Sequence, residues 1–206
     1  MAFSDLLHGR PLIAILRGVA ADDAVRISHA VWDSGIGRVE VPIQTPEAIK
    51  ALRAVAAAGA TRDEVVGAGT VVNTTLVDVA LDAGAGFTVA PGLDEDVWQA
   101  SLTAGLPHLP GVATATEVHR AMSLGAEWVK VFPAGALGPT WFTAMRGPFP
   151  QARFVATGAI DAGNVGDFLR AGVVAVGVGG SITQPGGVEA IVEAVRNACD
   201  GQTTGS

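Results

Sequence analysis

Short apolar runs alternate with helical patterns along the whole chain, and this alternation constrains the fold more than any other feature. The runs are nearly continuous in apolar residues, which is typical of parallel strands that are covered on both faces. Eight such units, with no linker and no low-complexity segment between them, predict a single α/β domain, a closed (β/α)8 TIM barrel. An open, doubly wound sheet is the alternative, but the even spacing of the units favours closure. The predicted strands are Leu12–Arg17, Val39–Gln44, Val65–Val71, Phe87–Pro91, Pro107–Val112, Trp128–Pro133, Arg153–Ile160 and Val173–Gly179.

The predicted helices have recognisable ends. Thr45-Pro46-Glu47 places a capping threonine, a proline and an acid where a helix begins, and Asn73, Asp94 and Asp161 are expected to cap other helices. The last gap between helix-ending glycines is about double the others and leaves room for an additional unit around Gly147-Pro148. We expect the barrel to span residues 1–200 and residues 201–206 to form a disordered tail. Glycines that suit a left-handed C-terminal cap are Gly35, Gly59, Gly84, Gly105, Gly125 and Gly172.

The composition and charge exclude several classes of protein. The net charge is −7 and Lys and Arg form no run, which argues against a nucleic-acid-binding surface. No apolar stretch reaches the ~18 residues of a membrane helix, and the segment MAFSDLLHGR lacks the pattern of a secretory signal. The single cysteine, Cys199, has no partner for an internal disulfide and is expected to be a structural thiol. We therefore expect a cytoplasmic protein with no nucleic-acid or membrane partner.

The chain has two lysines, and one of them lies where a charge is unexpected. Lys50 falls on a helix with room for a solvated face, whereas Lys130 falls inside the sixth predicted strand. Strand alternation puts Lys130 on the same face as Trp128 and Phe132, so that it points into the barrel. An amine held there loses solvation, and its neutral, nucleophilic form becomes accessible. A structural ion pair is the alternative role.

Glu40 and Arg17 are two further charged residues in predicted strands. The second strand carries Glu40, and in an eight-stranded barrel the second and sixth strands stand opposite each other across a narrow interior. We therefore expect Glu40 to approach Lys130, either as a salt bridge or as the proton shuttle of Schiff-base chemistry. Arg17 closes the first strand, at the end where the active sites of barrels assemble. Pairing with a helix is its alternative role.

Glycine-rich segments end the seventh and eighth predicted strands, at Ala156–Ile160 and Val176–Ser181. The loops at these positions in barrels commonly bind phosphate, because bare backbone N–H groups and a helix N-terminus point at the anion. Turn formation alone is the alternative role of these glycines. The histidines show no metal-ligand spacing, and no nucleotide-binding motif occurs. We therefore expect neither a metal nor a cofactor.

Ordered sequence blocks extend from Pro11 to about Cys199. They are Pro11-Leu-Ile-Ala-Ile-Leu-Arg-Gly18, Val39-Glu-Val-Pro42, Val66-Gly-Ala-Gly-Thr70, Ala90-Pro-Gly92, Pro110-Gly111, Ala113-Thr-Ala-Thr-Glu117 and Val129-Lys-Val-Phe-Pro133. Together these blocks resemble the class I aldolases that act on 2-keto-3-deoxy-6-phosphogluconate (KDPG) and 2-keto-3-deoxy-6-phosphogalactonate (KDPGal). Several blocks in the family's order are far more specific than any one of them.

The resemblance implies a lyase that splits a 2-keto-3-deoxy-6-phospho-aldonate into pyruvate and glyceraldehyde 3-phosphate. It also implies a homotrimer, with Lys130 as the Schiff-base lysine and Glu40 as the acid/base. The remaining residues that it implies form two groups, one around the pyruvate moiety and one near the phosphate. The first group is Thr70, Pro91 and Phe132, and the second is Gly158, Ala159, Gly179, Gly180 and Ser181.

The chain departs from both branches of this family. Gln44 stands where KDPG enzymes usually have an arginine, and Arg17 stands where they have none, as in the KDPGal branch. We expect both residues to contact the substrate, with Arg17 and Thr70 holding its carboxylate. Thr157, also expected at the substrate, resembles the KDPG branch instead. Ala159 replaces a usual glycine, which trims backbone access beside the phosphate. The residues leave the preferred C4 epimer open.

Two other functions fit the same barrel. An isomerase or epimerase of phosphosugars would use Glu40 as a base and Lys130 only as a charge. A non-catalytic phosphosugar sensor would keep the barrel and its loops. Trapping of a pyruvate imine with borohydride separates the aldolase from both alternatives, because only an imine former gains mass.

Overall fold

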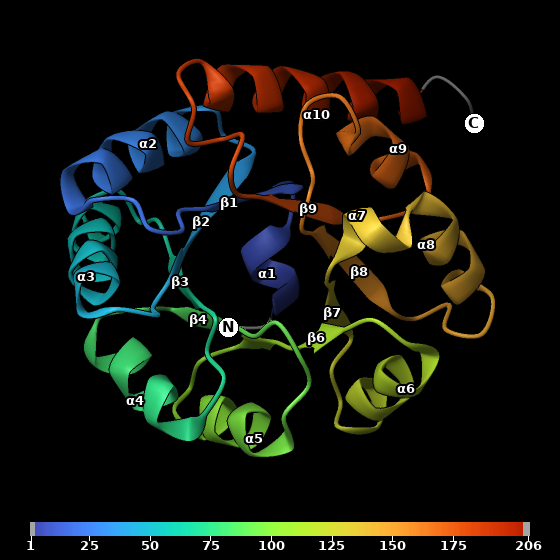
Figure 1. The fold of residues 1–206 in the computed structure, drawn as a ribbon, viewed down its shortest axis with the longest axis horizontal. Coiled ribbons are helices and arrows are strands. Elements are labelled where there is room, and N and C mark those ends of the chain that lie inside the picture. Colours follow the sequence, from blue (N-terminus) through green and yellow to red (C-terminus); the bar gives the residue numbers. More distant parts are fainter. Residues whose placement is uncertain (1–2, 204–206) are drawn as a thin grey trace.

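The computed structural model describes residues 3–203, and it describes the side chains of residues 3–200. A ring of parallel strands lies inside a ring of helices, as the view down the barrel axis shows (Figure 1). The strands follow one another in the order β5-β4-β3-β2-β1-β9-β8-β7-β6. Their bounds are β1 Leu12–Ile15, β2 Gly37–Pro42, β3 Val66–Gly69, β4 Phe87–Val89, β5 His108–Leu109, β6 Gly111–Val112, β7 Trp128–Val131, β8 Arg153–Thr157 and β9 Ala175–Val178.

The nine segments correspond to the eight predicted strands because the fifth is interrupted. Pro110 separates β5 from β6 and has no N–H to donate to the neighbouring strand. Its carbonyl still accepts a hydrogen bond from Lys130 N at 2.8 Å, so the chain crosses from the β4 side to the β7 side without leaving the wall. β1 pairs with both β2 and β9, which completes the ring. The predicted closed barrel is confirmed.

The helices cover the outside of the barrel, except for α1. They are α1 Phe3–Leu7, α2 Ala21–Asp33, α3 Pro46–Ala60, α4 Thr74–Asp82, α5 Glu95–Thr103, α6 Ala115–Ser123, α7 Ala134–Leu137, α8 Pro139–Arg146, α9 Val165–Arg170 and α10 Gly187–Thr203. Two of them, α7 and α8, lie between β7 and β8, where the long gap in the sequence predicts an additional unit. α10 continues to Thr203, past the predicted domain boundary at 200, and residues 204–206 of the predicted tail lie outside the described residues.

Most predicted helix ends are confirmed, with two corrections. Thr45, Asn73 and Asp94 accept backbone N–H bonds at the starts of α3, α4 and α5. Asp161 does not cap α9, because its Oδ1 accepts from Gly163 N at 2.8 Å and so closes the turn before that helix. Gly59 does not end a helix in a left-handed conformation but lies inside α3, where a Cβ would meet the carbonyl oxygen of Glu64 at 2.6 Å.

Two apolar layers form the core. One lies between the strands and the outer helices, and the other fills the barrel interior toward the N-terminal ends of the strands. Helix α1 closes that end and lies across the middle of the ring of strands in Figure 1. The ring of Phe3 contacts Phe87 and Trp128 with centroid separations of 5.7 and 6.0 Å. Arg38 Nε donates to the carbonyl oxygen of Leu6 at 2.7 Å and ties the helix down. In the part of the chain that the structure describes, the interior is therefore closed at the N-terminal ends of the strands and open toward their C-terminal ends, where barrels carry their active sites.

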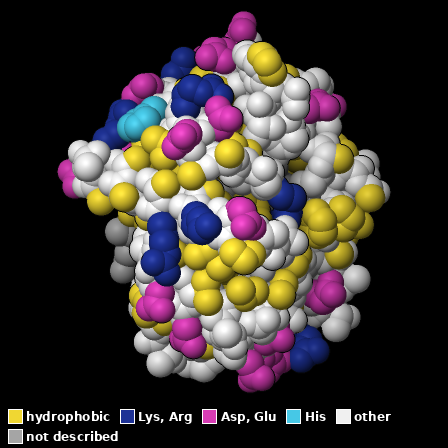
Figure 2. All heavy atoms as spheres, turned by 60° about the vertical axis from the view of Figure 1, so that its left-hand side comes forward, with side chains coloured by type: hydrophobic (Ala, Val, Ile, Leu, Met, Phe, Trp, Pro, Cys, Tyr) yellow, Lys and Arg dark blue, Asp and Glu magenta, His cyan; other side chains and the backbone are white. Residues whose placement is uncertain are grey.

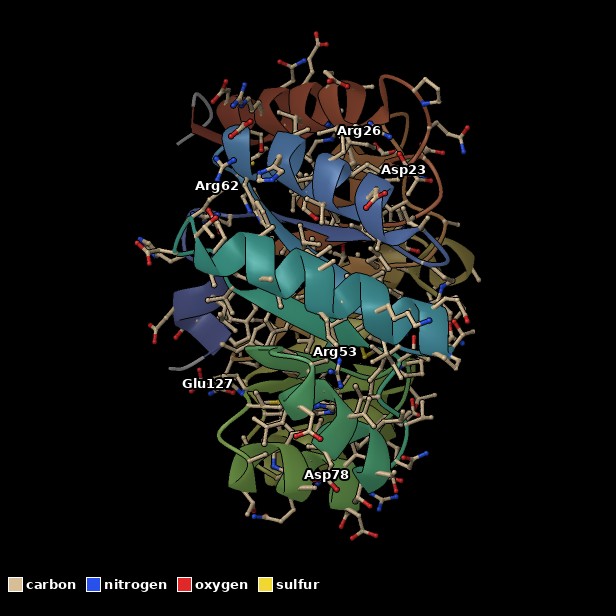
Figure 3. The ribbon with its side chains drawn as sticks, turned by 90° about the vertical axis from the view of Figure 1, so that its left-hand side faces the viewer. Asp23, Arg26, Arg53, Arg62, Asp78 and Glu127 are labelled. Carbon is tan, nitrogen blue, oxygen red and sulfur yellow. The ribbon has the colours of Figure 1, made fainter. Side chains whose placement is uncertain are left out.

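The surface carries charges of both signs. Figure 2 shows basic and acidic side chains interspersed with apolar ones on the face that it presents. On the side that Figure 3 presents, Asp23 and Arg26 of α2 pair at 2.7 Å, and Arg62 lies in the turn after α3. None of the helices in residues 3–203 is both long and apolar enough to cross a membrane.

Candidate active site

Lys130 and Glu40 meet inside the barrel, as their strand positions predict. Lys130 Nζ lies 4.0 Å from Glu40 Oε1, and the two residues are only 4% and 1% exposed. The separation is longer than a hydrogen bond, and Glu40 Oε1 has no hydrogen-bond partner. The amine also lies over the ring of Phe132, 5.8 Å from its centroid. A buried carboxylate oxygen without a partner is costly, and a reacting proton would give it one.

The absence of a side chain at Gly69 of β3 leaves room for the Glu40 carboxylate of β2. Glu40 and Gly67 are register partners, and Gly69 ends β3 one step further along the barrel axis. A Cβ built on Gly69 would lie only 1.9 Å from Glu40 Oε1 and 2.7 Å from its carboxyl carbon. Position 69 must therefore lack a side chain if Glu40 is to reach Lys130.

Arg17 lies at the mouth of the barrel with two of the predicted substrate residues. It follows β1 by two residues and is exposed. One guanidinium nitrogen donates to Gln44 Oε1, and Nη2 donates to Thr70 Oγ1 at 3.4 Å. Thr70 itself has φ +60°, an unusual backbone conformation for a β-branched residue. The segments after β1, β2 and β3 thus hold the Arg17 guanidinium at the mouth of the cavity that Lys130 lines, and this group has further N–H donors that the two bonds do not use.

A cavity of about 490 Å³ opens beside Lys130 and extends to the loops after β8 and β9. Thr157 lines it, buried, and its Oγ1 donates to Val131 O at 3.3 Å. Ser181 Oγ, after the neighbouring strand β9, is buried and has no hydrogen-bond partner. The segments after both strands begin as turns, so no helix starts directly at the cavity. The cavity is lined by Ile15, Arg17, Lys130, Phe132, Thr157, Gly158, Ala159, Ile160, Asp161, Gly177, Gly179, Gly180, Ser181 and Thr183.

Twelve of the thirteen predicted site residues belong to one constellation. Nine line the cavity, while Glu40 adjoins Lys130, and Gln44 and Thr70 adjoin Arg17. Pro91 is the exception, since it follows β4 at the same end of the barrel but does not line the cavity. Five lining residues were not among the predicted ones: Ile160 and Gly177, which belong to the predicted glycine-rich segments, and Ile15, Asp161 and Thr183, which lie outside them. Of these last three, Ile15 had a usable signal, because it lies two residues before Arg17 and shares its face.

A second cavity of about 490 Å³ lies at the opposite end of the barrel, next to α1 and α5. Its wall includes His108, which is 3% exposed and whose Nδ1 lies 2.8 Å from Thr88 Oγ1. Burial lowers the pKa of His108 to about 4, and the Asp94 carboxylate offsets only part of this effect. His108 is therefore neutral at pH 7, and it does not line the cavity beside Lys130. Among the described side chains, no group of His, Cys, Asp and Glu is placed to hold a metal ion.

Comparison with known proteins decides the family. The family model of the KDPG and KHG aldolases matches residues 4–193. The chain belongs to the KDPG and KHG aldolase family. The predicted family is thereby confirmed, and so is the predicted class of enzyme, a lyase that cleaves a carbon–carbon bond.

Individual members support this aldolase assignment over most of the chain. A probable 2-dehydro-3-deoxy-6-phosphogalactonate aldolase of Rhizobium meliloti is 34% identical over 86% of this chain and 84% of its own length. A KHG/KDPG aldolase of Escherichia coli is 33% identical over 95% of this chain and 94% of its own. The solved structure of a Legionella pneumophila KDPG aldolase, with pyruvate captured as a covalent carbinolamine, has a TM-score of 0.81 at 30% identity and covers 94% of this chain and 96% of its own.

Proposed function

We propose that this aldolase cleaves a 2-keto-3-deoxy-6-phospho-aldonate into pyruvate and glyceraldehyde 3-phosphate through a Schiff base on Lys130. The buried Lys130–Glu40 pair at the floor of the cavity carries this proposal. A lysine buried in the interior of a barrel is a nucleophile for a ketone once it is neutral. A carboxylate 4.0 Å away, with a free oxygen, is within reach of the reacting groups through one water or after a small shift.

The reaction begins with attack of the Lys130 amine on the C2 ketone. Glu40 transfers protons as the resulting carbinolamine loses water to give a cationic imine. Glu40 then takes the proton of the C4 hydroxyl, and the C3–C4 bonding electrons move into the imine. Glyceraldehyde 3-phosphate leaves, and the pyruvate enamine is protonated at its methylene carbon. Hydrolysis of the imine frees pyruvate and restores the lysine.

The two ends of the substrate fit the two ends of the cavity. The carboxylate next to C2 is held by the Arg17 guanidinium and Thr70 Oγ1, since a planar cation suits a carboxylate. The phosphate binds between the loops after β8 and β9, where Ser181 Oγ lacks a partner and the chain is rich in glycine. Binding at both ends orients the reacting carbons over Lys130.

The protein is proposed to act as a homotrimer in the cytoplasm. Support for self-association comes from a solved protein cage designed by fusing symmetric oligomeric domains, which matches 95% of this chain at 31% identity with a TM-score of 0.86. Light scattering of the purified protein should give the mass of three chains. A monomer at micromolar concentration would contradict the trimer.

The cleavage of the two C4 epimers tests the proposed reaction. Wild-type protein should release pyruvate and glyceraldehyde 3-phosphate in equal amounts, and EDTA should leave the rate unaltered. Glu40→Gln keeps the shape of the side chain but removes the proton shuttle, so kcat should fall by roughly 10²- to 10⁴-fold. A product that is an isomer of the substrate, with no pyruvate released, would support an isomerase or epimerase instead.

A further inference from the structure

The backbone is strained at one point of the cavity wall. Among residues 3–203, three residues other than glycine have a left-handed φ: Asp63 at 56°, Thr70 at 60° and Ala159 at 56°. L-residues pay a steric cost in this conformation because Cβ crowds the backbone. Thr70 and Ala159 lie at the barrel mouth, whereas Asp63 lies after α3, near the other end. Strain that is retained at a site points to a function for the residue that carries it.

The methyl group of Ala159 fits against a glycine on the neighbouring element. A Cβ built on Gly135, in the first turn of α7, would lie 2.7 Å from the Ala159 methyl carbon and 3.1 Å from the carbonyl oxygen of Gly158. Gly135 N donates to that carbonyl at 3.0 Å, so the β8 loop and α7 are held together. The Ala159 methyl therefore fills the space that Gly135 leaves, between the loop and α7.

The loop is also fixed on its other side. Asn164 Nδ2 donates to the carbonyl oxygen of Ala159 at 2.9 Å, and Asn164 Oδ1 accepts from Asp161 N at 3.0 Å. The loop cannot easily carry the Ala159 methyl away from the cavity, because bonds hold it from both sides. Ala159 is thus a fixed part of the cavity wall, with its methyl group wedged between the loop and α7.

This part of the wall faces the end of the substrate that is distal to the Schiff base. Ala159 follows Thr157 by two residues, on the side of Ser181, whereas Arg17 stands on the carboxylate side. The cations that line the cavity are Arg17 and Lys130, so a distal phosphate depends on neutral donors such as backbone N–H groups and Ser181 Oγ. Because the Ala159 methyl separates this loop from α7, it limits how closely the backbone N–H groups of the loop can approach a distal phosphate.

We propose that Ala159, accommodated by Gly135, is a specificity-determining residue that weakens the preference of the enzyme for phosphorylated over unphosphorylated substrates. The inference rests on the proposed function of the same cavity. It concerns only the distal group, because the imine at Lys130 forms at the other end of the substrate.

Aldol synthesis from pyruvate tests this inference with two aldehydes. The ratio of kcat/KM for D-glyceraldehyde 3-phosphate to kcat/KM for D-glyceraldehyde is measured in the wild type and in Ala159→Gly. Removing the methyl should raise this ratio about tenfold, the gain of roughly one better hydrogen bond to a charged group, mainly through a lower KM for the phosphorylated aldehyde. Asp63→Gly relieves the same backbone strain away from the cavity and should leave the ratio unchanged.

A second variant tests the contact between the two elements. Gly135→Ala should raise KM for the phosphorylated aldehyde in the wild-type background, because the new methyl meets that of Ala159. The same change should do less in the Ala159→Gly background. An unchanged ratio in Ala159→Gly, or an equal rise in Asp63→Gly, overturns the inference even if pyruvate is trapped normally. Failure of the wild type to trap pyruvate overturns the proposed function and this inference together.

Discussion

The Glu40 carboxylate shares the barrel interior with the Lys130 amine at 4.0 Å, and its Oε1 has no hydrogen-bond partner. A buried ion pair is weak support for stability, because desolvation of the two charges offsets most of their attraction. Proton transfer explains the arrangement better, since it needs an oxygen that is not already bonded. The sequence predicts this meeting because strand alternation and the positions of the second and sixth strands are enough to place both side chains.

The two bonded residues at the mouth of the barrel, Arg17 and Gln44, have unequal roles. Gln44 Oε1 accepts from the Arg17 guanidinium, so Gln44 orients Arg17 while Arg17 supplies the charge. Arg17→Ala should raise KM for the keto acid by roughly 10- to 100-fold, as expected for a lost hydrogen bond to a charged group. Gln44→Ala should raise it less. Steady-state kinetics with both variants checks this, and pyruvate saturation that is unaffected in Arg17→Ala would make Arg17 a rim residue only.

The elements were more predictable than their ends. The alternation of apolar runs and helical patterns predicts every strand, but Arg17 and Gln44 lie beyond β1 and β2, since pairing stops before the apolar run does. Pro110 splits one strand because it cannot donate. Gly59 resembles the other helix-ending glycines in sequence, and only its contact with Glu64 shows a different reason for glycine. Helix α1 escaped prediction because tertiary packing on Phe87 and Trp128, rather than a long periodic pattern, stabilises it.

The contact between β2 and β3 at Gly69 predicts that a side chain at this position disturbs the Glu40 carboxylate. Gly69→Ala would place a methyl 1.9 Å from Glu40 Oε1, so the carboxylate must move away from Lys130. We expect kcat to fall by roughly 10²-fold or more, with a loss of about 1–3 kcal/mol in the free energy of unfolding from overpacking. Kinetics and urea unfolding measure the two effects. Gly92→Ala, where an added Cβ meets nothing within 4 Å, is the matched control. Full activity in Gly69→Ala would show that Glu40 has another way to fit.

For the whole molecule, the two ends of the barrel divide stability from chemistry. The end closed by α1 holds the interior apolar cluster and the neutral His108, whereas the open end holds the charges that react. The sequence shows this division only in part, because the side chains at the end closed by α1 come from strands that are far apart in the chain. The sequence predicts the charged residues of the open end much better, since a charged residue inside an apolar strand stands out.

His108 makes the stability of the whole molecule depend on pH. Its pKa is about 4 in the folded protein and about 6.5 in the unfolded chain, so the unfolded chain binds more protons between these values. Stability should therefore fall as pH drops from 6.5, by about 2 kcal/mol from this residue by pH 5. Urea unfolding at pH 7 and pH 5 measures it. His108→Gln should lose much less stability over this range, and an equal loss in both proteins would contradict the role of His108.

Borohydride reduction in the presence of pyruvate tests the central claim most directly. The chain has two lysines, and Lys50 is exposed on α3 whereas Lys130 lies inside the barrel beside Glu40. The wild type should gain one reduced pyruvate adduct, and peptide mapping should find it on Lys130 alone. Lys130→Arg should gain none while keeping the fold. An adduct on Lys50 with Lys130 unmodified, or full cleavage activity in Lys130→Arg, would contradict the Schiff-base mechanism.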